Sequence, residues 1–159
     1  MHGVNQSINC LDTMCSAKTD LICLQETWLN VDSMLRIFDC FSSDYYIFCS
    51  SAMDEKQKSE ILKGRPFGGM CVLFNKLFYN VFSKVDCLRS EPNYIIIKAD
   101  DLLIVNIYLP SARSFVDYDN VDILLDEIAD TCAGVPHEEI LICGDCNCNV
   151  LSDTLEFHN

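Results

Sequence analysis

Three short apolar runs, each of strand length, lead directly into side chains that carry oxygen. Glu26 follows the first run, Asn106 and Tyr108 lie in the second, and Asp145 and Asn147 follow the third. Strand ends in α/β proteins are positions where rigid polar groups converge. Because oxygen atoms are the preferred ligands of hard cations such as Mg²⁺, the pattern predicts a metal site at strand ends.

Each of these residues also has an ordinary interpretation. Glu26 alone is typical of a strand that turns to solvent, and Tyr108 alone of a packed strand aromatic. Asp145 and Asn147 are two positions apart, so in an extended backbone their side chains point the same way and can serve one centre. The stretch Gly-Asp-x-Asn is just as typical of a turn, because these residue types dominate turns.

Helices alternating with strands are expected to position these side chains. Periodicity predicts helices before residue 19, with Ile8, Leu11 and Cys15 on one face, and over residues 31–38 and 117–131. The predicted strands are 21–25, 45–49, 70–74, 81–85, 94–98, 102–108 and 139–143. We expect 81–85 to pair with 70–74, and 94–98 to form a hairpin with 102–108.

The last predicted helix is amphipathic. Its apolar face carries Val121, Leu124, Leu125 and Ile128, and its acidic residues form a solvated face. Strands that alternate with helices, together with a hairpin, predict a layered α/β domain with a mixed sheet.

Composition limits the class of protein. At 159 residues and 50% hydrophobic content, the chain fits one domain over residues 1–159 with a sizeable core. Its apolar runs are far shorter than the roughly 20 residues that cross a bilayer, so no membrane span is expected.

Residues 1–6 show no secretory signal, so we expect an intracellular protein, cytoplasmic or nuclear, that is not secreted. Eleven cysteines without such a signal favour free thiols over a disulfide framework.

The net charge argues against a protein that coats nucleic acids. The chain has 24 acidic and 11 basic residues, and its formal charge of -13 repels polyanions. Metal ions at site carboxylates and the local basic segment 56–65 relieve this repulsion in part.

Taken in order, the motifs resemble the endonuclease/exonuclease/phosphatase superfamily, which has the DNase-I-like fold. They are Leu24-Gln-Glu26, Gly68-Gly69 opening a strand, Asn106-Ile-Tyr108-x-Pro110 and Gly144-Asp-x-Asn147. Within the superfamily, Leu24-Gln-Glu-Thr-Trp-Leu29 and Gly64-Arg-Pro-Phe-Gly-Gly69 look most like the endonuclease domains of LINE-type, non-LTR retrotransposons. The resemblance spans nearly the whole chain.

The resemblance implies a four-layer α/β sandwich with two mixed, largely antiparallel central sheets, here incomplete. It also implies phosphodiester cleavage by a water that Mg²⁺ assists, with Mn²⁺ as a substitute. By matching motif, Glu26 and Asp145 would bind the metal, and Tyr108 would contact the scissile phosphate. Asp145 would also activate or orient the attacking water, and Asn147 would help to hold phosphate and nucleophile.

The resemblance further implies DNA as substrate, or another phosphodiester, and a reverse-transcriptase domain as a partner in a longer protein. Asn106, Arg65 and Arg113 are candidate substrate contacts, although lone arginines on loops are more often merely solvated.

Two family motifs have no counterpart in the sequence. The family begins with a strand that ends in a catalytic Asn and closes with Ser-Asp-His, whereas Asp153 and His158 stand in a different context. Because the parts of such a site act together, we expect these 159 residues to have little or no nuclease activity alone. Unpaired strand edges should also make the chain poorly soluble.

Two other interpretations remain open. A zinc-binding module would use Cys143, Cys146 and Cys148 with His137 and His158, but Cys143 lies in a predicted strand and no second Cys-x-x-Cys pair is present. A non-catalytic relic or interaction domain that keeps the fold would agree with the acidic charge and the missing motifs.

Overall fold

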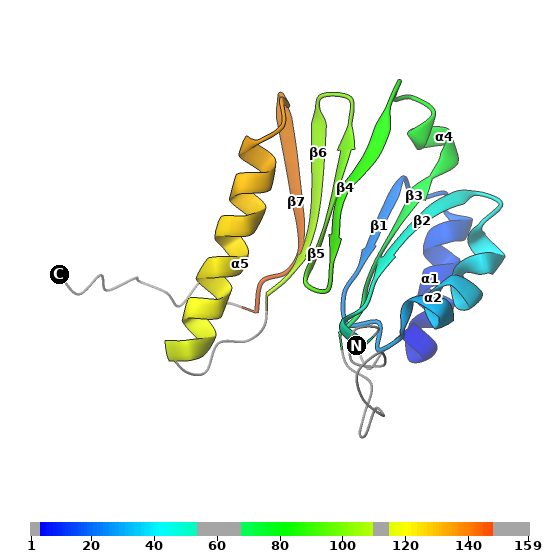
Figure 1. Ribbon diagram of the computed structural model, residues 1–159. Helices are drawn as coiled ribbons and strands as arrows, with labels where there is room; N and C mark the ends of the chain where they lie inside the picture. The colour runs from blue at the N-terminus through cyan, green and yellow to red at the C-terminus, as the bar shows by residue number, and fades with distance from the viewer. Residues whose placement is uncertain (1–3, 54–67, 110–114, 148–159) are drawn as a thin grey trace.

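The computed structural model describes residues 4–53, 68–109 and 115–147 (Figure 1). Its helices are α1 (Val4–Ser16), α2 (Val31–Phe38), α4 (Lys76–Tyr79) and α5 (Phe115–Ala133), with a 3-10 turn, η1, at Asp39–Phe41. Its strands are β1 (Leu21–Leu24), β2 (Tyr45–Ser50), β3 (Met70–Asn75), β4 (Val85–Glu91), β5 (Tyr94–Ala99), β6 (Leu102–Tyr108) and β7 (Glu139–Asp145). Apart from the strand expected at 81–85, every predicted helix and strand is present.

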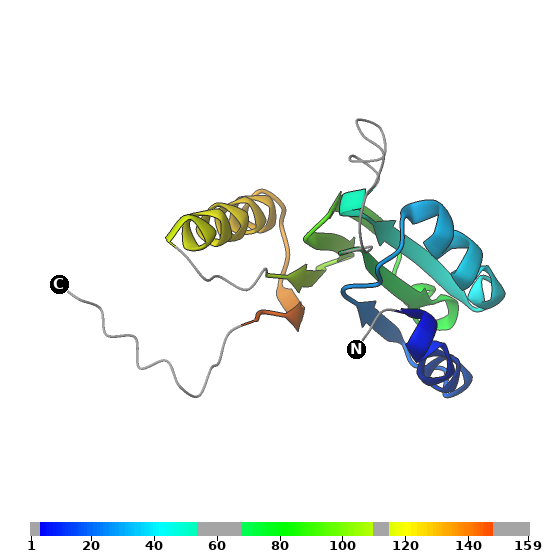
Figure 2. The same cartoon turned by 90° about the horizontal axis from the view of Figure 1, so that it is seen from below.

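Two sheets pack face to face between layers of helices. The first has strand order β1-β3-β2 and is antiparallel throughout. The second has order β4-β5-β6-β7, and only β7 runs parallel to its neighbour. Helices α1 and α2 cover the outer face of the first sheet, and α5 lies against the outer face of the second (Figures 1 and 2). The predicted four-layer α/β sandwich with two largely antiparallel sheets is therefore confirmed, and the second of the two sheets is mixed.

The central strands are buried on both faces, which explains their continuous apolar sequences. In β3, Val72 and Phe74 point between the sheets, whereas Cys71 and Leu73 point to the helical layer. This alternation follows from the two-residue period of a strand. Strand β5 behaves in the same way, because Ile95 and Ile97 face the first sheet while Tyr94 and Ile96 face α5. These two strands hold the layers together.

Helix α5 packs through a narrower stripe than its sequence suggests. Ile128 is buried, and Val121 and Leu124 are partly buried against the second sheet. Leu125, which we expected on the same face, is 41% exposed. The expectation was wrong because the stripe runs through positions 121, 124, 128 and 132, so that Leu125 falls at its edge.

The strand expected at 81–85 does not exist, and its pairing with 70–74 was wrong. The side chain of Asn75 accepts a hydrogen bond from the Leu77 backbone N–H at 2.9 Å, which starts α4 and ends β3. Phe82 then packs edge-on against Phe74 at 6.1 Å between ring centroids. The chain re-enters a strand only at Val85, in the other sheet. A helix cap thus overrode the apolar pattern.

Within residues 4–53, 68–109 and 115–147, strand β7 forms an open edge of its sheet. It lies beside β1 of the other sheet, where the Cys143 thiol contacts the Cys23 thiol at 3.2 Å. Ile140, Leu141 and Ile142 are 45%, 45% and 58% exposed. An apolar strand with an unpaired edge is a site for association with other chains. No helix in the described part of the chain has the length and apolar character needed to span a membrane.

Candidate active site

The segment after β1 is held in an unusual backbone conformation. Glu26 and Trp28 both have left-handed φ angles, of 51° and 57°. The N–H groups of Thr27 and Trp28 donate to the carbonyls of Gly69 and Gly68 at 3.0 and 2.8 Å, which ties this segment to the entrance of β3. A left-handed residue other than glycine costs about 1–2 kcal/mol, so the surrounding contacts must fix Glu26 in place.

Gly69 explains the glycine pair noted in the sequence. Its φ is +87°, and a Cβ added there would lie 2.3 Å from the Thr27 hydroxyl oxygen and 3.0 Å from the Leu29 carbonyl oxygen. Only glycine permits this approach. The pair therefore does more than open a strand, because it lets the Glu26 segment lie directly against β3.

Glu26 and Tyr108 meet across the two sheets. The Tyr108 hydroxyl donates a hydrogen bond of 2.7 Å to Glu26 Oε1, and both side chains are half-buried. Burial, together with the hydrogen bond to Glu26, raises the pKa of Tyr108 to about 12 from its ordinary value of 10.0. The phenol therefore keeps its proton near neutral pH and acts only as a hydrogen-bond donor to anions.

The end of β7 brings Asp145 next to Tyr108. The two residues are register partners in the parallel pair β6–β7, and the Leu109 N–H donates to the Asp145 carbonyl oxygen at 2.9 Å. Gly144 permits this pairing, because a Cβ there would lie 1.9 Å from the Ile107 carbonyl oxygen. The glycine before Asp145 is thus a requirement of the strand pairing.

Asp145 and Asn147 form a turn, which is the second of the two interpretations that their sequence left open. Asp145 Oδ1 accepts a hydrogen bond from the Asn147 N–H at 2.9 Å, and Asn147 has a left-handed φ of 47°. The Asn147 amide donates to the Leu109 carbonyl at 2.7 Å. A hydrogen bond from the Asn147 side chain lowers the pKa of Tyr108, and the charge of Asp145 raises it. The turn therefore still directs both residues toward Tyr108.

The structure thus brings four of the predicted site residues together at one end of the sandwich. They are Glu26, Tyr108, Asp145 and Asn147. The other three behave differently. Asn106 is fully buried, so it lies behind this surface, while Arg65 and Arg113 fall outside the described residues.

Two carboxylates at this end suit a hard cation. Glu26 and Asp145 each have one oxygen in a hydrogen bond to the protein, from Tyr108 and Asn147 respectively. Mg²⁺ is usually held by one or two carboxylates together with water and substrate phosphates, and this donor set fits that pattern.

The cysteine-rich zinc site is not formed in the described residues. Cys143 is engaged with Cys23, and His137 lies before β7, at the opposite end of that strand from Cys146. Cys148 and His158 are outside the described residues. Within residues 4–53, 68–109 and 115–147, no cluster of three or more Cys, His, Asp and Glu side chains could hold a metal ion.

Sequence reasoning missed the role of Gln25. Its side-chain amide donates to Asn106 Oδ1 at 2.5 Å, directly beside the bond between Glu26 and Tyr108. The available signal was a polar residue in each of two otherwise apolar runs. A polar amide inside an apolar strand needs a hydrogen-bond partner, so two such amides indicate a pair.

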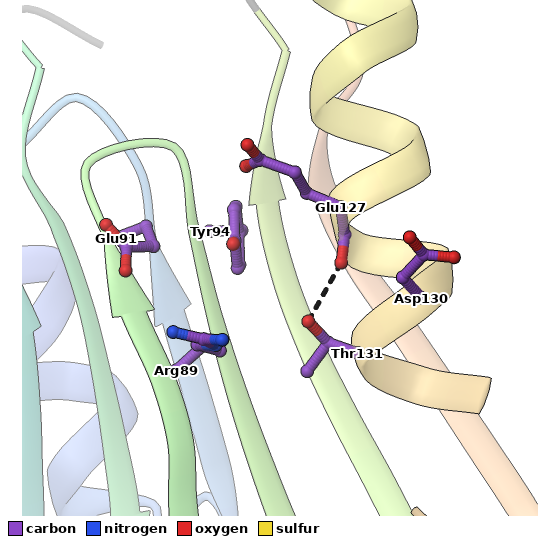
Figure 3. Close-up of a pocket in the computed structure, with 6 residues that line it drawn as sticks. All are labelled: Arg89, Glu91, Tyr94, Glu127, Asp130 and Thr131. Carbon is purple, nitrogen blue, oxygen red and sulfur yellow. Dashed lines mark hydrogen bonds between the residues drawn. The ribbon is translucent and has the colours of Figure 1, made fainter. Parts of the chain in front are cut away.

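A separate hollow of about 400 Å³ lies between the second sheet and α5 (Figure 3). It is lined by Arg89, Glu91, Tyr94, Glu127, Asp130 and Thr131. Tyr94 faces α5, whereas Tyr108 faces the other sheet, so this hollow is not part of the Glu26 site. Its acidic lining makes it a poor place for a phosphate.

Comparison with solved structures identifies the fold. The chain is similar to a 3′ phosphatase from Neisseria bound to a product DNA hairpin (TM-score 0.61, 12% identity, 92% of this chain and 55% of that one). It is also similar to an AP endonuclease from Archaeoglobus fulgidus (TM-score 0.60, 16% identity, 92% of this chain and 54% of that one). A third similar structure is a 3′-5′ exonuclease from Neisseria meningitidis (TM-score 0.59, 12% identity, 91% of this chain and 54% of that one). The fold is therefore the DNase-I-like α/β sandwich of these nucleases, and the chain spans about 55% of their length. No family model and no curated protein matches the sequence.

Proposed function

We propose that this chain carries the metal-dependent, phosphodiester-cleaving site of an endonuclease that nicks DNA. One observation carries the proposal: Glu26, Tyr108 and Asp145, which lie far apart in the sequence, meet at one end of a nuclease-like sandwich. A phenol donor beside two carboxylates is suited to an anionic phosphodiester only when a cation offsets the carboxylate charges. The DNA-processing neighbours of the same fold support this substrate.

Glu26 and Asp145 would hold Mg²⁺, with Mn²⁺ as a substitute. When bound, the metal supplies charge neutralisation at the phosphate and a more acidic water. That neutralisation matters in this chain, because its net charge of -13 otherwise repels DNA.

The side chains divide the remaining work. The Tyr108 hydroxyl donates its one hydrogen bond to Glu26 in this structure. In the complex it would donate that hydrogen bond to a non-bridging phosphate oxygen. Asp145 would orient the attacking water and accept its proton, because it stands exposed beside Tyr108. Asn147 would help to hold the phosphate, with its orientation fixed by the Leu109 carbonyl.

The retrotransposon context is a further part of the proposal. It is supported by Leu24-Gln-Glu-Thr-Trp-Leu29 and Gly64-Arg-Pro-Phe-Gly-Gly69, and it implies a reverse-transcriptase domain in the longer protein. The chain spans about 55% of the neighbouring nucleases, so we propose that it is weak or inactive by itself. Reverse-transcriptase motifs in a longer transcript would support the context, and their absence would count against it.

A plasmid-nicking assay tests the proposed activity. We expect slow conversion of supercoiled DNA with Mg²⁺, orders of magnitude below a complete nuclease, with loss of activity on chelation or in Glu26→Gln. Glu139→Gln is the matched control, because Glu139 is an exposed carboxylate at the far end of β7. Nicking that persists in Glu26→Gln contradicts the site, and vigorous nicking by the wild type contradicts the proposed weakness.

The second candidate is a non-catalytic interaction domain. It is favoured by the charge of -13 and by the exposed apolar residues of β7. Slow metal-dependent nicking that is lost in Glu26→Gln would support the first function. An interaction domain would give no nicking at any protein concentration and no Mn²⁺ binding that depends on Glu26.

A further inference from the structure

We propose that Gln25 and Asn106 are positioning residues, joined in a side-chain amide bridge that orients Glu26 and Tyr108. Neither amide touches substrate, and both act through the residues beside them. The inference rests on the proposed function for its consequence in catalysis, but the bridge itself can be tested without activity.

Asn106 is the anchor of the bridge. It lies within β6 and its side chain is fully buried, so each of its polar atoms needs a partner. Its Oδ1 accepts from Gln25 Nε2 at 2.5 Å, and its Nδ2 donates to the carbonyls of Leu24 and Cys71, both at 3.4 Å. These partners belong to the other sheet, to the end of β1 and the start of β3. One side chain therefore fixes the two sheets relative to each other at the site.

The bridge and the site share the same two elements. Gln25 immediately precedes Glu26, and Asn106 stands two residues before Tyr108, on the same face of β6. The two cross-sheet bonds, Gln25 to Asn106 and Tyr108 to Glu26, are therefore neighbours. Movement of either amide displaces one partner of the carboxylate–phenol bond.

The backbone of Glu26 shows why such support is needed. Its left-handed φ of 51° is held on the C-terminal side by the bond from the Thr27 N–H to the Gly69 carbonyl. On the N-terminal side, Asn106 holds the segment by contact with the Gln25 side chain and the Leu24 carbonyl. Without that contact the segment can relax toward a common backbone conformation, and the carboxylate then turns away from Tyr108.

Two apolar side chains in place of Gln25 and Asn106 would fill the same space at a lower desolvation cost. The buried Asn106 and the half-buried Gln25 add a directional constraint, since the bond between their side chains forms in only one relative placement of the sheets. Partners behind a metal ligand commonly change metal affinity 10–100-fold when removed.

The test compares Asn106→Ala and Gln25→Ala with Asn75→Ala. Asn75 is a matched control, because it is also a buried strand asparagine and lies at the opposite end of β3. The direct readout is the ¹³Cζ NMR resonance of Tyr108, which reports its hydrogen bond to Glu26. We expect Asn106→Ala and Gln25→Ala to shift this resonance toward its position in Glu26→Ala, and Asn75→Ala to leave it unchanged. An unmoved resonance in folded Gln25→Ala overturns the inference, even if Asn106→Ala fails to fold.

A second readout separates this inference from the proposed function. Mn²⁺ affinity, measured by electron paramagnetic resonance, should fall roughly 10-fold in Asn106→Ala and Gln25→Ala. The double variant should lose little more than the worse single one, since both remove the same bridge. Equal Mn²⁺ affinity in wild type and Glu26→Gln overturns the metal site but leaves the Tyr108 result standing. A shifted Tyr108 resonance with unchanged Mn²⁺ affinity would show that the bridge orients Tyr108 alone. It would overturn the proposed role of the bridge in positioning Glu26.

Discussion

The two ends of the double sheet are built on different principles. At the site end, where β1, β6 and β7 finish, the sheets are joined by polar bonds such as the one between Glu26 and Tyr108. At the closed end, where β3 finishes, Phe78 and Phe82 pack around the buried ring of Phe74. Apolar packing tolerates small shifts, whereas a hydrogen bond specifies distance and direction. We therefore expect the closed end to contribute most to the stability of the fold, and the site end to fix the positions of the candidate site residues.

Backbone strain follows the same division. Among the described residues, Glu26, Trp28 and Asn147 at the site end are left-handed without being glycine, and Gly68, Gly69 and Gly144 also have positive φ there. Lys18 and Asp100 have the same conformation at the closed end. Asp100 is compensated there, because its carboxylate accepts the N–H groups of Ser83 and Lys84 at 2.8 and 2.9 Å. Concentrated strain is expected where the fold holds functional groups against their local preference.

The largest effect should come from the closed end. Phe74→Ala removes a fully buried ring that contacts three other aromatic rings, so we expect a loss of about 3–5 kcal/mol in the free energy of unfolding. Urea unfolding followed by circular dichroism measures it. Under native conditions the Tyr108 resonance should be unchanged. A loss in the free energy of unfolding below about 1 kcal/mol would contradict the view that the closed end contributes most to stability.

Gly144→Ala should have the next largest effect. The new Cβ would meet the Ile107 backbone at 1.9 Å, so β7 must shift away from β6. We expect a loss of about 2–3 kcal/mol and faster amide hydrogen exchange confined to β7 and the end of β6. Gly134→Ala is the control, since its added Cβ would lie 3.2 Å from the nearest backbone oxygen. Equal effects from both changes would contradict a strand pairing that depends on Gly144.

Tyr108→Phe should cost about 1 kcal/mol at neutral pH, through loss of the bond to Glu26. The loss should depend on pH. Because the folded pKa of Tyr108 is raised to about 12 from 10.0, the hydroxyl stabilises the fold fully below pH 10 and loses that contribution as pH rises through 12. The wild-type and Phe stability curves should therefore converge between pH 10 and 12. A constant difference across this range would show that the phenol is not held by Glu26.

The smallest effect on stability should come from the open edge. Ile142→Lys places a charge at a residue that is 58% exposed, so the free energy of unfolding should change by less than about 0.5 kcal/mol. Light scattering at high protein concentration should fall, because a lysine on an edge strand opposes association. Val81→Lys is a matched control with 74% exposure away from this edge. Similar solubility gains in both variants would contradict association through β7.

The elements, and the positions of the candidate site residues at strand ends, could be predicted because they follow from local patterns. The apolar runs around Ile95 and Val105 specify buried strands, and the motif order placed Glu26, Tyr108 and Asp145 at strand ends. What failed depended on contacts between distant residues. The sequence around Asp145 and Asn147 left an extended pair and a turn equally open, and only the hydrogen bond from the Asn147 N–H to Asp145 decides for the turn.

The prediction of a strand at 81–85 was wrong because Asn75 caps α4 and ends β3. The periodicity of apolar residues does not show such a cap, because the cap is a hydrogen bond between a side chain and the backbone. Likewise, Asn106 was assigned to the substrate because it stands near Tyr108 in the sequence. Its burial and its bond to Gln25 exist only once the two sheets have packed.

Paramagnetic relaxation by Mn²⁺ tests most directly the central proposal, that Glu26 and Asp145 at the site end bind a divalent cation. We predict that Mn²⁺ selectively broadens the amide resonances of Glu26, Tyr108 and Asp145, that excess Mg²⁺ reverses the broadening, and that Glu26→Gln abolishes it. Resonances of the acidic hollow at Glu127 and Asp130 should be unaffected. Broadening centred on that hollow, or none at the site end at millimolar metal, would contradict the account.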